Sequence, residues 1–235
     1  MGYLIKREFS AFFSTPFGYV FMGIFLVLSG VSFTTFNLLG GGGDLAGTFS
    51  LLSNMSFIVF PVLTMRLYAD DRKTGTEHLL FSSRLHVWQI ILGKYIAVFL
   101  VFLCTLAITL IYLGIIARFG SPNYGAALAS YLGYILLSMA MIATCMFFAS
   151  LAESQVTAAV LSFGALFALV MFGPLARTLQ IPIVRDVFRA LAITQPYDEI
   201  TRGIFRLGPV SYYLAFTAIM LFATVKALEW RRLRG

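Results

Sequence analysis

The chain has 235 residues, of which 60% are apolar and only 11% are charged. Soluble domains are about 45–50% apolar and about 25% charged, and a chain of this size cannot bury so much apolar surface in one core. The composition excludes a soluble enzyme, a nucleic-acid-binding module and a disordered protein, and it predicts a protein whose main solvent is lipid. In a membrane protein, basic residues mostly mark the cytoplasmic side. The net charge of +7 therefore indicates no nucleic-acid partner.

Several segments are long and apolar enough to cross a bilayer, which takes about 20 residues. In chain order they are Phe17–Leu39, Thr48–Tyr68, Trp88–Ala117, Gly125–Leu151, Val156–Leu179 and Val210–Leu228. Pro16 precedes the first segment and Gly208-Pro209 precedes the last, as expected of residues that interrupt helices. The predicted fold class is an all-α integral membrane protein with six transmembrane helices in a single domain, 1–235.

The positions of Lys and Arg predict the orientation of these spans. Two basic residues precede the first span, five lie between the second and third, and four accompany the C-terminus. The other side carries one basic residue between the third and fourth spans and five between the fifth and sixth. Because basic residues collect on the cytoplasmic side, we expect both termini and the loop after the second span in the cytoplasm.

The first 16 residues form an amphipathic pattern. Leu4 and Phe12 fall on one side of a helix, whereas Lys6 and Arg7 fall elsewhere. A basic amphipathic helix typically lies in the plane of the membrane surface. We therefore predict an interfacial helix over 1–16.

Residues 180–207 form a second pattern outside the spans. A proline-initiated amphipathic helix is predicted over Pro182–Leu191, with Phe188 on its apolar face. Pro196 is expected to end this pattern, and a shorter helix over Asp198–Phe205 is expected to follow. Together they predict a helical hairpin at the extracytoplasmic surface, before the last span.

The loop at 69–87 is rich in charge in an otherwise apolar chain. Thr74 or Thr76 can cap a short helix whose first turn holds Glu77, after a turn that Gly75 permits. Such a charged and apolar helix suits docking into a groove of another protein, and a solvated loop that merely joins two spans is the alternative. The residues assigned to docking are Asp70, Asp71, Arg72, Lys73, Gly75, Thr76, Glu77, Leu79, Leu80 and Phe81.

Motifs for catalysis or cofactor binding do not stand out. The chain has no P-loop, HExxH or GxSxG sequence, so we expect no catalytic residue, no metal site and no cofactor in this chain. Glu153 lies at the short turn after the fourth span and outside the spans, which disfavours an ion-coupled carrier. It is interpreted, with Gln155, either as a gating turn or as a solvated turn.

Motifs along nearly the whole chain resemble those of ABC-2 type permeases. Phe60-Pro61 begins a stretch that continues through Met65-Arg66 and Gly75-Thr76-Glu77 to Leu79-Leu80. Asp70-Asp71 stands where the family usually has a pair of glutamates, and Ser154 stands where it usually has Asn. The remaining matches are Gly93-Lys94, the turn Ser150–Gln155, Thr201-Arg202-Gly203 and the ending Leu228–Arg232. Within the family, the chain looks most like the permeases of gliding motility and, more distantly, those of nitrous-oxide reductase maturation.

This resemblance implies a permease subunit of an ATP-driven exporter in a bacterial inner (cytoplasmic) membrane, without its own ATPase. Two permeases, identical or paralogous, would pair around a path, and two copies of a separate ATPase subunit would bind ATP and Mg. The loop at 69–87 would be the coupling helix that receives the ATPase. The alternative is a non-transporting anchor that passes ATPase movement to an extracytoplasmic partner protein, and a membrane enzyme ranks third.

Overall fold

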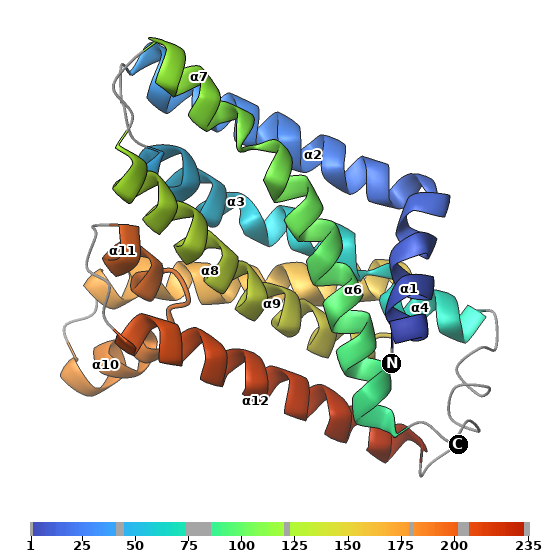
Figure 1. Cartoon of the computed structure of the whole chain (residues 1–235). Coiled ribbons are helices and arrows are strands. Elements are labelled where there is room, and N and C mark those ends of the chain that lie inside the picture. The colour runs from blue at the N-terminus through green and yellow to red at the C-terminus, as the bar shows by residue number, and fades with distance from the viewer. Residues whose placement is uncertain are drawn as a thin grey trace.

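The computed structural model describes residues 2–40, 45–73, 86–119, 123–178, 181–201 and 207–232, except for the side chains at 70–73, 119, 182 and 232. All regular elements in these ranges are helices (Figure 1). They are α1 (Gly2–Ser14), α2 (Pro16–Phe33), a π-helical extension η1 (Thr34–Leu39), α3 (Ala46–Thr64), α4 (Arg66–Lys73), α6 (Val87–Ile108), α7 (Ile111–Phe119), α8 (Tyr124–Leu151), α9 (Gln155–Thr178), α10 (Pro182–Leu191), α11 (Gln195–Thr201) and α12 (Leu207–Arg232).

Six helical stretches within the described ranges are long and apolar enough to cross a membrane. The prediction of an all-α protein with six transmembrane helices is therefore confirmed, and the predicted ends differ from the observed ones by at most about three residues. The observed stretches are Pro16–Leu39, Ala46–Ala69, Val87–Arg118, Tyr124–Leu151, Gln155–Thr178 and Leu207–Arg231.

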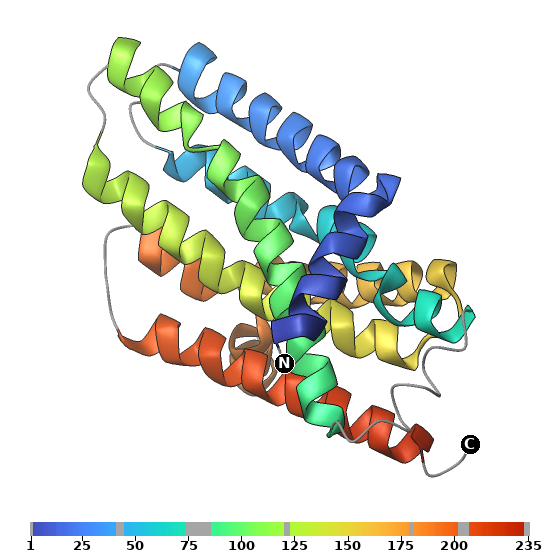
Figure 2. The same cartoon turned by 45° about the vertical axis from the view of Figure 1, so that its right-hand side comes forward.

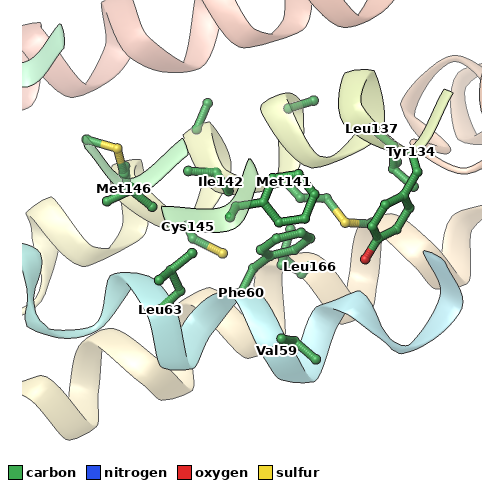
Figure 3. Packing of buried hydrophobic residues seen from close by; sticks show 14 of the residues in the cluster. Val59, Phe60, Leu63, Tyr134, Leu137, Met141, Ile142, Cys145, Met146 and Leu166 are labelled. Atoms are coloured by element: carbon green, nitrogen blue, oxygen red, sulfur yellow. The ribbon is translucent and has the colours of Figure 1, made fainter. Parts of the chain in front are cut away.

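Helix α8 forms the centre of the bundle. It packs against α3, α9 and α12, and Leu137, Met141 and Cys145 on it are fully buried. Figure 3 shows these side chains against Phe60 of α3 and Leu166 of α9. Since lipid is as apolar as the interior, such close packing, rather than the hydrophobic effect, holds transmembrane helices together.

Two of the spans are broken into two α-helices each. The second breaks at Met65, after Pro61, a residue that cannot donate a backbone hydrogen bond. The third breaks at Thr109 and Leu110, which leaves backbone groups to satisfy. The Thr109 carbonyl accepts a hydrogen bond from the Tyr112 amide at 2.9 Å and another from the hydroxyl of Tyr131 of α8 at 2.8 Å. A neighbouring helix therefore adds a hydrogen bond at the break. The sequence pattern predicted the third span as one uninterrupted helix.

The two ends of the bundle carry different elements. Helix α1 and the C-terminal part of α12 lie at one end, which we call the terminal end, and α10 and α11 lie at the other, the far end (Figures 1 and 2). Helix α11 begins at Gln195, with Pro196 in its first turn. The expectation that Pro196 separates two helices and that the second begins at Asp198 is therefore wrong by one turn, because proline is well accommodated at a helix start. Residues 202–206 lie outside the described residues.

Helix α10 packs against α9 through an aromatic contact. The ring of Phe188 meets that of Phe172 edge-to-face, with centroids 4.9 Å apart. Tyr212 and Tyr213 of α12 donate hydroxyl hydrogen bonds to the carbonyls of Ala190 and Ile193, at 3.1 and 2.7 Å. Helix α10 and the residues after it are thus attached to the last two spans, and α11 packs against α8 and α12.

Placing a charge at Phe188 should detach α10 from the bundle. Phe188→Asp loses a half-buried ring that packs on Phe172, and full burial of a large apolar side chain is worth about 1.5–3 kcal/mol. We expect the thermal midpoint of the purified protein to fall by roughly 5 °C or more. Arg189→Asp, on the exposed side of the same helix, should change the midpoint little. Equal midpoints for the two variants would contradict the packing of α10.

Candidate functional site at the terminal end

Lys94 of α6 is the most deeply buried cation among the described residues, with 1% of its surface exposed. Its ammonium group donates to the Leu67 carbonyl of α4 at 2.9 Å and lies 3.3 Å from Glu8 Oε2 of α1. A lysine is rarely buried unless it is paired, and here three helices supply the parts of the site. We call Glu8, Lys94 and the Leu67 carbonyl the terminal junction.

The sequence of α1 positions Glu8 for this contact. Leu4, Glu8 and Phe12 recur every four residues, so they share one face of the helix, and Leu4 and Phe12 are buried. Gly93 lets that face approach α6, because a side chain there would come 2.5 Å from Leu4 Cδ2. Helix α1 is therefore seated on α6 beside Lys94, with its one acid directed inward.

Electrostatics favour the ionised form of Glu8. Burial by itself raises the pKa of the Glu8 carboxyl, but the charge of Lys94 and the hydrogen bond and charge of Arg7 outweigh it, so the pKa lies below its ordinary value. The Arg7 guanidinium is 2.7 Å from Glu8 Oε1. The Glu8 carboxyl in the junction is thus ionised near neutral pH.

Cationic contacts extend the junction to neighbouring helices. The Arg66 guanidinium lies 4.1 Å from the centre of the Phe17 ring, which links the start of α4 to the start of α2. The Lys94 ammonium lies 5.8 Å from the Tyr68 ring of α4. Such contacts add about 0.5–2 kcal/mol each according to their exposure. Helices α1, α2, α4 and α6 therefore meet at one charged site.

The predicted docking residues lie immediately after this junction. Asp70, Asp71, Arg72 and Lys73 belong to the last turns of α4 and not to a loop, since α4 continues from the second span after the break at Met65. Their side chains lie outside the described residues. Gly75, Thr76, Glu77, Leu79, Leu80 and Phe81 also lie outside the described residues. The backbone up to 73 shows what precedes them: a short helix whose Leu67, Tyr68 and Ala69 are buried.

The predicted gating turn also lies at the terminal end. Glu153 is exposed in the bend between α8 and α9, and Gln155 is the first residue of α9. Ser154 accepts a hydrogen bond from the Thr157 amide at 3.1 Å, as a helix cap does. Since Asn and Ser cap helices about equally well, the departure from the usual Asn is conservative. Arg231 of α12 donates to the Leu151 carbonyl at 2.6 Å, which holds the end of the last span beside this turn.

A second unusual surface runs along α3 and α9. The Phe57 ring lies 5.4 Å from Phe163 and 5.3 Å from Phe167, centroid to centroid, and both α9 rings are more than 40% exposed. Asn54 is exposed near the middle of α3, where its amide donates to the Ser50 carbonyl. A polar amide facing lipid at this depth is costly. We call this surface the α3/α9 face.

Sequence reasoning missed Glu8, Lys94 and Arg231 as site residues. Lys94 did give a signal, because a lysine among the apolar residues of a span is energetically costly and is therefore a candidate functional residue. Glu8 gives a weaker signal, since an acid in a surface helix is ordinary. Arg231 bonds across 80 residues of sequence, and no local pattern predicts that. No group of three or more potential metal ligands exists among the described residues.

The helices and motifs agree with the comparison to known proteins. Residues 31–226, well over half of the chain, match the family described as "ABC-2 family transporter protein". The chain therefore belongs to the ABC-2 transporter family, and it is a multi-pass membrane subunit of such a transporter. A search of the curated proteins finds no match.

The junction makes a prediction about acid. Glu8 stabilises the fold through its charged form, and its pKa is lower in the folded protein than in the unfolded chain, where it is about 4.3. Its contribution is then fully present above that value and is lost as the pH falls through the folded pKa. Glu8→Gln should lower the free energy of unfolding by about 1.5–3 kcal/mol at neutral pH and flatten the acid side of a plot of thermal midpoint against pH. Glu199→Gln, at the exposed far end, should leave that plot unchanged, and an unchanged plot for Glu8→Gln would contradict the pairing.

Proposed function

We propose that this chain is the permease subunit of an ATP-driven exporter, which uses ATP and Mg bound by a separate ATPase subunit in two copies per complex. The observation that carries the proposal is the terminal junction. It attaches α1 and α6 to α4, and α4 leads directly into the segment 69–87 that we assign to the ATPase. A push on that segment would reach three helices at once.

The ATPase would dock on the segment 69–87. ATP binding brings two ATPase subunits together, and each would carry its coupling segment with it. Because α4 is short and its carbonyl at Leu67 is bonded to Lys94, its displacement would tilt α6 and α1 as one body. A ligand shifts an equilibrium only by its difference in affinity between two states, so the docking contacts must differ between the ATP-bound and free forms.

A second permease, identical or paralogous, would cover the α3/α9 face. The exposed Asn54 amide and the exposed rings of Phe163 and Phe167 support this, since an amide needs polar partners in the membrane and aromatic rings suit an interface. Export would follow by alternating access between the two subunits. The turn at Glu153 and Gln155 would then sit at the terminal mouth of the path and help to gate it.

The same reasoning gives the location and orientation. The charge bias supports cytoplasmic termini, and α1 and the end of α12 lie at one end of the bundle (Figure 1). We propose a bacterial inner membrane, with α10 and α11 on the extracytoplasmic side. The closer resemblance to the permeases of gliding motility and nitrous-oxide reductase maturation belongs to the same proposal.

A non-transporting role is the second candidate. Helix α10 leaves Ile183, Val187 and Leu191 exposed, at 77%, 52% and 42%, and their spacing puts them on one face. An extracytoplasmic partner protein could bind that face and receive movement from the ATPase. Substrate uptake into inverted vesicles that requires ATP would favour export, whereas ATP-dependent binding of a partner without uptake would favour this alternative.

Changes in the coupling segment should release the ATPase. Leu80→Glu removes an apolar contact worth about 1.5–3 kcal/mol, and Gly75→Val restricts the backbone at a turn. We expect either variant to lose at least about nine-tenths of the co-purified ATPase, since 1.4 kcal/mol is tenfold in affinity. Leu39→Glu is the matched control, because Leu39 is 81% exposed at the other end of the first span. Release by Leu39→Glu alone would overturn the assignment.

The proposed orientation can be tested by labelling. In a chain with Cys104 and Cys145 replaced, a cysteine at Arg189 should react with a membrane-impermeant maleimide added outside intact cells. A cysteine at Lys6, which is exposed on α1, should react only after the cells are opened. Labelling of position 6 from outside would reverse the orientation.

A further inference from the structure

An apolar groove opens between the third and fourth spans, toward the far end of the bundle. Its volume is about 510 Å³, and its surface consists almost entirely of carbon. The floor is formed by the buried Leu106, Ala127 and Tyr131, and the exposed Leu110, Leu128 and Leu132 form the rim. A cavity of this size accommodates a ligand, and the lining selects an apolar one.

The break in the third span produces the groove. At Thr109 and Leu110 the chain changes from α6 to α7, so α7 does not continue along the path of α6 beside α8 (Figure 2). The Thr109 hydroxyl lies 3.2 Å from the Tyr131 hydroxyl, which also donates to the Thr109 carbonyl. These polar groups therefore satisfy one another, and the groove is left with the apolar sides of the two helices.

The groove faces away from the surface assigned to the second permease. Helix α8 lies between them: one of its sides packs on α3 and α9, and the groove lies on the side toward α6 and α7 (Figure 1). If the α3/α9 face meets the second permease, as proposed above, the groove faces lipid. What fills an apolar groove in the hydrocarbon region is then an acyl chain.

A cation lies beyond the groove along α7. Arg118 is exposed in the last turn of α7, five residues beyond the lining residue Leu113. At 1.5 Å per residue this is about 7–8 Å further along the helix, at the level of the first turn of α8, where Tyr124 also lines the groove. A guanidinium at the end of a span reaches the headgroup region and pairs well with phosphate.

We propose that this groove is a binding site for one phospholipid of the leaflet at the far end. One acyl chain lies between α6, α7 and α8, and the phosphate of the headgroup pairs with Arg118. Because the site includes the α6–α7 break, a bound chain fills the space into which α7 and α8 would otherwise close. The lipid would then hold the outer half of the third span apart from the fourth.

The test uses the permease–ATPase complex in nanodiscs that contain phosphatidylethanolamine with a diazirine in the acyl chain. After irradiation and digestion, labelling should concentrate on the segments that contain Leu106–Leu113 and Tyr124–Ile135. Ala127→Phe should reduce that labelling to the level of outward-facing helix surfaces, and Leu128→Phe at the rim serves if the first variant does not fold. Leu214→Phe, on an exposed side of α12, is the control and should change nothing.

Two further variants separate the alternatives. Arg118→Ala should reduce labelling roughly five-fold, which corresponds to about 1 kcal/mol, and Arg118→Lys should restore most of it. Labelling spread evenly over all exposed helix surfaces, or unaffected by both groove variants, would overturn the site. A disulfide between a cysteine at Leu128 and a second permease would also overturn the site. A change in ATPase coupling caused by variants in the segment 69–87 would bear only on the proposed function.

Discussion

The terminal end of this protein depends on a lysine that is removed from water. Lys94 is buried where α1, α4 and α6 meet, and transfer of an unpaired charge into such a place costs several kcal/mol. Glu8 and the Leu67 carbonyl make that burial possible. None of the three helices can therefore move away alone without removing a partner from a buried charge. A buried ion pair adds little net stability by itself, but it specifies which helices stay in contact.

That constraint also fixes α1 to the bundle. An amphipathic helix held only by lipid would follow the membrane surface, whereas α1 is attached to α6 by Leu4 against Gly93 and by Glu8 at Lys94. The core around α8 is close-packed, and close-packed elements move as rigid bodies rather than deform. Movement delivered through α4 would thus be shared by α1 and α6, while the groove between α7 and α8 offers the far half of the third span room to move differently.

The sequence predicted the six spans because a bilayer imposes a length and a polarity that a linear scan can read. It also predicted α10, where Pro182 and the apolar spacing agree. Contacts between distant residues were beyond such a scan: Glu8 meets Lys94 across 86 residues and Arg231 meets Leu151 across 80. The break at Thr109 was also missed, because it contains neither Gly nor Pro and its contact with the Tyr131 hydroxyl joins two helices. The coupling role of every residue from Asp70 to Phe81 stays a prediction from pattern and resemblance.

A double-mutant cycle on Glu8 and Lys94 tests the central claim most directly. Lys94→Met leaves the Glu8 carboxylate without its main partner, and removal of one member of a buried pair costs about 3–5 kcal/mol. In Glu8→Leu with Lys94→Met, no buried charge remains in the pair, so we predict a thermal midpoint of the purified complex above that of Lys94→Met alone. If the losses of the two single variants simply add in the double variant, the two side chains do not interact, and the account of the junction is contradicted.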